Sequence, residues 1–459
     1  MLENFAKKIS TSKKLPEFMR KFIEIYNMEN ISKNKKSFQT EKMKVPAILF
    51  SEERNFEKSD VLEAVEKIAE NKNVFCSIAV LSEAHTKPNI ENPTGAIVAS
   101  KDIIPKMLDA ATNCGMRVIL TDLSESELTE ENIKNLFAEF KKNIPSKKII
   151  GTKISKKMVA DIFRHGSPAL KNTFPIQTKN EFENTFSQGN FFANQEISEQ
   201  EISGAIPKII SWIAKFRLGL LGATNSHFVY LMRVSEILDE NLASTLGIRN
   251  DQYVFFMHTG SSIVGRYTAS LYTQRKIKSF SQKLILFLIK LFSKCDWNDS
   301  KKIDIAFRAT GNYGFANRTL ITCEIHKALE KILARKVSTE LLYDAPHVYF
   351  DEETHFDQKV IVHRNGANRA FGASKMARHA VFSQTGEPVL IAPFVKEIAY
   401  IGVGTDQNEE TFFSANHEIG KITGLENPKE YAEKIVQEME ENKIIKTVAK
   451  LETITFLTY

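Results

Sequence analysis

Four side chains that can bind a transition metal lie beside apolar runs that are far apart in the sequence. They are Cys114 in NCGM, His227 in NSHF, His258 in MHTGS and His347 in DAPH. Thiolate sulfur and imidazole nitrogen hold transition metals, and a structural zinc knuckle would place such donors in close pairs. The wide spacing instead favours a catalytic site assembled from several strand ends, although each residue taken singly is more often part of a core or a turn.

A second group of reactive side chains lies in the segment 360–421, where short apolar runs alternate with polar stretches. The group consists of His363, Arg364, Arg369 and His417. All four fall in or beside predicted connections, where a rigid scaffold usually holds chemistry.

Neither of the standard nucleotide motifs is present in this segment. The glycines of IGVGTDQN, residues 401–408, lack the third glycine of a dinucleotide fingerprint, and the Gly-Lys pair at Lys421 has Ala415 where a Walker loop needs its first glycine. A nucleotide would therefore have to be bound by other groups, such as a Gly-Ser turn together with Arg364 and Arg369.

The elements that must position these residues are predicted as alternating strands and helices. Short apolar runs predict strands at 45–50, 74–85, 116–123, 225–238, 253–262 and 451–459. Helical spacing of apolar residues predicts helices at 60–70, 129–144, 201–219, 266–294, 315–336 and 428–451. The polar stretch 185–200, which carries paired aromatics, is predicted to be a surface excursion.

Composition excludes a disordered or fibrous chain, because 42% of the 459 residues are hydrophobic. The net charge of +6 permits an anionic partner without requiring one. Four scattered cysteines without a CxxC pair predict a reducing cytoplasm rather than a disulfide scaffold. No signal peptide is predicted, and the longest apolar run, 284–292, contains Lys290, so we expect a soluble protein.

Two regions are predicted from the change in composition near residue 45. Residues 1–44 read as a helical N-terminal extension followed by a polar, lysine-rich linker at 30–44. The core is predicted to run from 45 to 459.

A series of sequence blocks resembles the RtcB family of RNA ligases. The family pattern has HF, HTGSRG, NxxxANR, DxxHN, HRKGA, GxPVLI and HGAGR blocks. This chain carries HFVYLMRVSEI, MHTGSS, GNYGFANR, DAPH, VHRNGANRAFG, GEPVLIAPF and FSANHEIGK in that order, after SEAH, PTGAIVAS and NCGMR. The resemblance implies one α+β core of mixed β-sheets flanked by helices, with a central cleft that contains metal.

The resemblance also implies a chemistry. Cys114 would bridge two manganese ions, His227, His258 and His347 would complete the ligands, and His417 would be the nucleophile. In the family reaction this histidine takes GMP from GTP, and RNA ends that carry a 3'-phosphate or 2',3'-cyclic phosphate are joined to 5'-hydroxyl ends in RNA repair or tRNA splicing. An archease-type activator would be a further partner. The positions implied to bind nucleotide or phosphate are Asn225, Asn312, Asn317, Arg318, Arg364, Arg369 and Lys421.

Several positions depart from the family pattern. Ala111 stands where the family has a metal-binding aspartate, and Asp109 is nearby but out of register. Tyr230 and Thr458 stand where the family has a glutamate and a lysine that contact guanine. Two alternatives therefore stay open: a nucleotidyl-histidine enzyme with altered nucleotide or end specificity, and a catalytically inactive, metal-containing RNA-binding protein.

Overall fold

The computed structural model describes most of the 459-residue chain. The described residues are 29–32, 34–51, 59–87, 91–109, 111–144, 150–193, 195–222, 226–273, 279–293, 295–420 and 427–458. The predicted helical extension lies almost entirely outside these ranges, as do two of the predicted site residues, Asn225 and Lys421.

The first sheet has seven strands in the order β1-β2-β3-β4-β5-β11-β10. The strands are β1 Glu29–Ser32, β2 Lys35–Phe38, β3 Ala47–Phe50, β4 Val74–His85, β5 Thr94–Ser100, β11 Gln358–Asn365 and β10 Val348–His355. Strands β3 and β4 pair in parallel, and the helix α3, Ser59–Ala69, makes the crossover between them. The other pairs in this sheet are antiparallel.

The second sheet also has seven strands, in the order β13-β14-β16-β7-β8-β6-β9, and all neighbouring pairs are antiparallel. The strands are β13 Pro388–Phe394, β14 Ile398–Gly404, β16 Ile445–Thr458, β7 Phe228–Ile237, β8 Tyr253–Thr259, β6 Gly115–Thr121 and β9 Thr339–Pro346. A short pair, β12 Ala367–Arg369 and β15 Ser414–Asn416, completes the strands described here. All of β6 and β8 is buried, which agrees with their nearly continuous apolar sequence.

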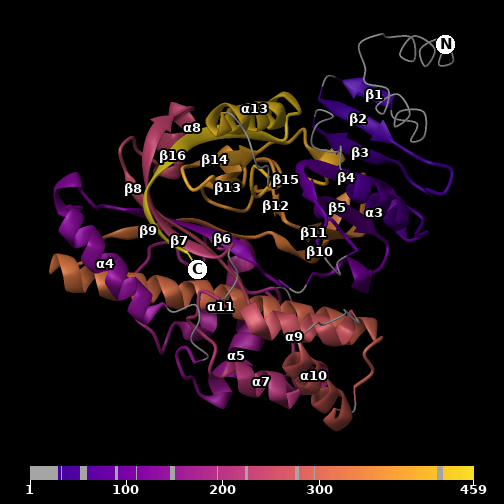
Figure 1. Cartoon of the computed structure of the whole chain (residues 1–459), viewed down its shortest axis with the longest axis horizontal. Helices are drawn as coiled ribbons and strands as arrows, with labels where there is room; N and C mark the ends of the chain where they lie inside the picture. The colour runs from indigo at the N-terminus through magenta and orange to yellow at the C-terminus, as the bar shows by residue number, and fades with distance from the viewer. Residues whose placement is uncertain are drawn as a thin grey trace.

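Most helices gather on one side of the sheets, around the long helix α11, Ser300–Leu333, which crosses the lower half of Figure 1. The other helices are α4 Glu130–Asn143, α5 Lys156–His165, α6 Glu199–Ala205, α7 Lys208–Ala214, α8 Glu240–Leu246, α9 Ser262–Tyr272, α10 Phe280–Phe292, α12 Phe382–Thr385 and α13 Pro428–Glu441. Residues of α11 enter three apolar clusters: one is shared with α5, α6, α7 and α9, one with α4 and the second sheet, and a third, through Phe315, with further residues of the second sheet. The helix therefore joins the helical layer to the sheets.

The predicted α+β class is confirmed by this arrangement of mixed sheets with a segregated helical layer. No helix among the described residues combines the length and the apolar character needed to cross a lipid bilayer.

Several expectations about local structure were wrong. The supposed linker 30–44 contains β2, which pairs with β3 across the predicted boundary and buries Phe38 completely. The stretch 185–200 is not a surface excursion, because Phe186 and Phe192 are buried at 2% exposure. The last predicted helix ends at 441, since the apolar run that follows alternates and pairs with β7 and β14 as the long strand β16.

Candidate active site

Three neighbouring strands bring Cys114, His258 and His347 together. Cys114 directly precedes β6, His258 lies near the end of β8, and His347 directly follows β9. Because β6 lies between β8 and β9, the first residues of β6 pair with β8 on one side and with β9 on the other. The backbone N–H of His347 donates to the carbonyl of Cys114 at 2.9 Å, which fixes the two residues side by side.

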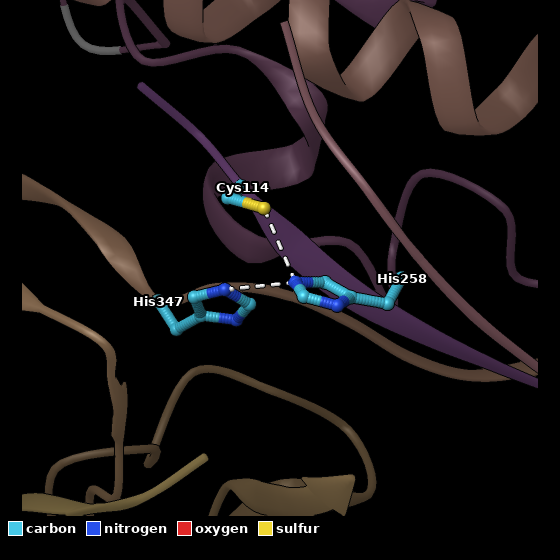
Figure 2. Close-up of side chains that lie close together, drawn as sticks. All are labelled: Cys114, His258 and His347. Atoms are coloured by element: carbon cyan, nitrogen blue, oxygen red, sulfur yellow. Dashed lines mark hydrogen bonds between the residues drawn. The ribbon is translucent and has the colours of Figure 1, made fainter. Parts of the chain in front are cut away.

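The donor atoms of these three residues converge on one point (Figure 2). Cys114 Sγ lies 3.1 Å from His258 Nε2, and His258 Nε2 lies 3.1 Å from His347 Nε2. One ligand atom from each residue lies within 4.8 Å of the others. Gly260 permits this approach, since a Cβ there would lie 2.4 Å from the carbonyl oxygen of Asn113.

The side chain of His227 approaches the same sulfur, with its Nε2 3.4 Å from Cys114 Sγ. In both His227 and His258, Nδ1 lies 2.6 Å from a backbone carbonyl, that of Leu221 or Ser226. A carbonyl can only accept, so Nδ1 carries the proton and Nε2 presents its lone pair to the sulfur. Such an outer hydrogen bond orients a metal-binding histidine.

Burial keeps this cluster uncharged in the absence of a cation. It raises the pKa of the Cys114 thiol to about 12 and lowers the pKa of His227 to about 4. Burial also lowers the pKa values of His258 and His347 well below the usual histidine range. The imidazoles are thus ready to donate lone pairs, while the thiol would release its proton on binding a metal ion.

His417 lies next to this cluster and is held by Glu83. The rings of His417 and His347 have centroids 4.5 Å apart. His417 Nδ1 lies 2.7 Å from Glu83 Oε2, and the two carboxylate oxygens also accept from the backbone N–H groups of His417 and Glu418. Burial alone would lower the pKa of His417, but the Glu83 carboxylate raises it. With Nδ1 engaged, Nε2 is the nitrogen available for chemistry.

Sequence analysis did not select Glu83, which is a fully buried carboxylate in the apolar strand β4. A lone acid near the end of such a strand was the available signal, and SEAH was already one of the matching blocks. The sequence did not show the partner of Glu83, because His417 lies 334 residues further along the chain.

The predicted phosphate-binding residue Arg318 faces other residues of the protein. Its side chain is fully buried and bonds to Asp344, to Asn113 and to the carbonyl of Thr259. Asn317 binds the carbonyls of Leu220 and Gly260 and the N–H of Gly219. Both side chains therefore hold the loops around Cys114, His227 and His258, and a direct contact with nucleotide stays a prediction.

The other predicted phosphate-binding residues are similarly occupied. Arg364 donates to Glu353, Tyr349, Ser414 and the carbonyl of Phe412, and His363 beside it lies inside β11. Arg369 pairs with Glu387 and lies over the rings of Phe186 and Phe371. Asn312 binds the carbonyl of Phe163, the side chain of Asn190 and the N–H of Phe191. These contacts stabilise the core around the site.

The positions that depart from the family pattern also have defined surroundings. Ala111 begins the turn that enters the site, where the N–H of Cys114 donates to its carbonyl at 2.6 Å. Asp109 is 6% exposed and lies 4.0 Å from Lys87 Nζ. Tyr230, at one of the two positions where the family resemblance implies a guanine contact, stacks on Phe456 with ring centroids 4.8 Å apart.

Comparison with known proteins gives a consistent assignment. A family model described as tRNA-splicing ligase RtcB matches residues 64–455. The relative from Methanococcus maripaludis, a tRNA-splicing ligase RtcB, is 29% identical over an alignment 444 residues long, which covers 89% of this chain and 86% of the relative. The proteins of the same name from Thermococcus kodakarensis and Nanoarchaeum equitans are 26% and 27% identical and cover 88% and 89% of this chain, or 85% and 87% of their own lengths. The chain therefore belongs to the RtcB family of tRNA-splicing ligases.

Proposed function

We propose that this chain is an RNA ligase that joins a 3'-phosphate or 2',3'-cyclic phosphate end to a 5'-hydroxyl end, using GTP and Mn²⁺, in tRNA splicing or RNA repair. Family membership supports the reaction class. The observation that carries the proposal is the position of His417, held by Glu83 and in ring contact with His347 of the Cys114–His258–His347 cluster.

The donor set fits a divalent transition metal ion. Cys114, His258 and His347 would hold it, and His347 Nδ1 is a buried nitrogen for which the described residues provide no hydrogen-bond partner. When bound, the ion supplies positive charge that stabilises the phosphoryl oxygens during displacement.

His417 would act as the nucleophile in the first step. Its Nε2 attacks the α-phosphorus of GTP, a P–N bond forms, and the bond to the β-phosphate oxygen breaks to release pyrophosphate. Glu83 holds the Nδ1 proton and stabilises the positive ring of the histidine–GMP adduct.

Two displacements would complete the reaction. An oxygen of the RNA 3'-phosphate attacks the adduct, so that GMP moves to the RNA and His417 is regenerated. The 5'-hydroxyl oxygen then attacks the phosphorus of the former 3'-phosphate, a phosphodiester forms, GMP leaves and the hydroxyl proton passes to solvent. A 2',3'-cyclic phosphate would first be opened by water.

Covalent labelling tests the proposal directly. The full chain with Mn²⁺ and each α-labelled nucleoside triphosphate should form an acid-labile, base-stable adduct with GTP, and His417→Ala should abolish it. His165→Ala, on the exposed face of α5, is the control. Absence of any label would contradict the proposal and favour the RNA-binding alternative.

A second candidate is favoured by the aromatic pair Tyr230 and Phe456. Because Tyr230 stands where the resemblance implies guanine recognition and its ring is stacked on Phe456, a nucleotidyl-histidine enzyme with a different nucleotide is the alternative. Covalent labelling by ATP rather than by GTP would establish this alternative. An archease-type activator remains a further proposal that rests on the family resemblance, and a cytoplasmic location remains one that rests on the scattered cysteines without a CxxC pair.

Replacing Glu83 with glutamine should slow adduct formation by about 100- to 10,000-fold, because a neutral amide neither orients the required tautomer nor stabilises the charged ring. The rate of single-turnover labelling measures the effect. Glu70→Gln, at an exposed carboxylate just after α3, should leave the rate unchanged. An unchanged rate in Glu83→Gln would show that this carboxylate does not position His417.

A further inference from the structure

The helix α10 carries the main concentration of exposed apolar side chains in the described part of the chain. Of the large hydrophobic residues that are exposed there, five lie on this one helix: Phe280, Leu284, Phe287, Leu291 and Phe292. Their exposed fractions run from 47% for Leu284 to 81% for Phe280. Single exposed apolar residues are ordinary on protein surfaces, but a contiguous group marks a surface that another body covers.

Most of these residues lie in a row along one side of α10. The row consists of Phe280, Leu284, Phe287 and Leu291. Successive members are four, three and four residues apart, which is the spacing of one helical face. A different face of the helix carries Leu286 and Ile289, which are buried at 9% and 1% exposure in the apolar cluster shared with α9 and α11. One face therefore holds the helix to the protein, and the row forms a second apolar face that the described residues leave uncovered.

The charged residues of α10 and of the helices α7 and α9 are all positive. Lys283 and Lys290 are exposed on α10, one turn before and one turn after Phe287, and within the described part of the chain neither is paired with a carboxylate. The helix α9 contacts both α10 and α7, and these two neighbours add Arg266 and Lys208 and no acidic residue. All three helices lie in the lower part of Figure 1. An occupant of this face should therefore combine an apolar contact surface with negative charge.

An anionic lipid bilayer has this combination of properties. Acyl chains accept a row of phenylalanine and leucine, while flanking lysine side chains reach the negatively charged headgroups. Trp212 on α7 is 62% exposed, and tryptophan favours the boundary between headgroups and acyl chains. A second copy of this chain fits less well, because it would bring the same basic residues to the same face and like charges would oppose the pairing.

We propose that the face of α10 formed by Phe280, Leu284, Phe287 and Leu291 docks this chain on the surface of an anionic lipid bilayer. The helix has 13 residues, which is too short to cross a bilayer, and its other face is held by the protein core. It would therefore lie along the boundary between headgroups and acyl chains. The helix contributes no residue to the Cys114–His258–His347 cluster, so docking there is independent of the proposed catalytic function.

Vesicle sedimentation tests the apolar part of the proposal with the full chain. The chain should sediment with sucrose-loaded vesicles of phosphatidylcholine and phosphatidylserine, and should stay in the supernatant with vesicles of phosphatidylcholine alone. Phe287→Ser with Leu291→Ser should lower the partition coefficient by at least about 10-fold, since two side chains no longer enter the acyl layer. Ile150→Ser, at an isoleucine with the same 60% exposure as Phe287, is the control.

The same assay tests the lysines. Lys283→Gln with Lys290→Gln should weaken binding to the anionic vesicles by about 10- to 30-fold, because each lysine loses its attraction to the charged headgroups. Lys134→Gln with Lys141→Gln, at exposed positions of α4 with the same spacing, removes the same charge and should leave binding nearly unchanged. All these variants should unfold at the temperature of the parent, because the replaced side chains are exposed.

Failure of the chain to sediment with the anionic vesicles would overturn the proposal. Equal binding by the parent and by Phe287→Ser with Leu291→Ser would also overturn it, since another surface would then hold the vesicle. Without vesicle binding, a dimer in sedimentation velocity that this double variant disrupts would assign the face to a second copy. A loss of affinity for tRNA in Lys283→Gln with Lys290→Gln, again without vesicle binding, would assign it to RNA.

Discussion

Replacing His258 with alanine should abolish manganese binding while the chain remains folded. The imidazole Nε2 of His258 is the central donor, lying 3.1 Å from both Cys114 Sγ and His347 Nε2. Without it the group of three donors keeps only the thiol of Cys114 and the imidazole of His347. We expect the affinity for Mn²⁺ to fall by more than about 100-fold, because loss of even an outer-shell partner can cost that much. Calorimetric titration of the metal-free protein measures the change.

Cys114→Ala should have the same effect, and both variants should unfold at nearly the same temperature as the metal-free parent. The fold does not depend on the ligands, since apolar residues of β6 and β8 form the surrounding core. His165→Ala provides a matched control at an exposed histidine. Full metal occupancy in both Cys114→Ala and His258→Ala would refute the ligand assignment.

The sequence shows the residue types at the site as side chains that can bind a transition metal, and the resemblance to a known family grouped them into one site. The sheet order that brings them together could not be predicted. Cys114, His258 and His347 meet because β6 lies between β8 and β9, strands that come from distant parts of the chain. Sequence patterns predict strands, but the pairing of strands depends on tertiary packing.

For the arginines, the type of side chain was visible in the sequence, but its binding partner was not. The family resemblance implied that Arg318 and Arg364 bind phosphate, since a matching motif gives the type of side chain and not its partner. Their carboxylate partners, Asp344 and Glu353, lie 26 and 11 residues away on other elements. A buried guanidinium requires such a partner, and a direct contact of these arginines with phosphate stays a prediction.

The lysine-rich segment 30–44 was mistaken for a linker for a related reason. Lysine does not exclude a strand: Lys35 and Lys36 lie on β2, which pairs with β1 on one side and with β3 on the other, and Phe38 supplies the apolar contact that fixes β2 to the sheet. Composition alone does not distinguish a solvated linker from such a strand.

Replacing Asp344 with alanine should be the most destabilising single change near the site. Asp344 is fully buried and accepts hydrogen bonds from two fully buried guanidiniums, those of Arg117 and Arg318. Glu181 also pairs with Arg117, but for the described part of the chain Asp344 is the one acid paired with Arg318. Removing it leaves a buried charge without compensation, which typically costs about 3–5 kcal/mol.

The loss should extend to metal binding, because Arg318 also holds the carbonyls of Asn113 and Thr259 on the loops that carry Cys114 and follow His258. We therefore expect Asp344→Ala to lower both the midpoint of chemical denaturation and the affinity for Mn²⁺, whereas His258→Ala lowers only the affinity. Asp102→Ala, at an exposed acid, should change neither. If Asp344→Ala reduced the free energy of unfolding by less than about 1 kcal/mol, the hydrogen bonds of Asp344 with Arg117 and Arg318 would be ordinary polar contacts. Packing, rather than Arg318, would then hold the loops at Asn113 and Thr259.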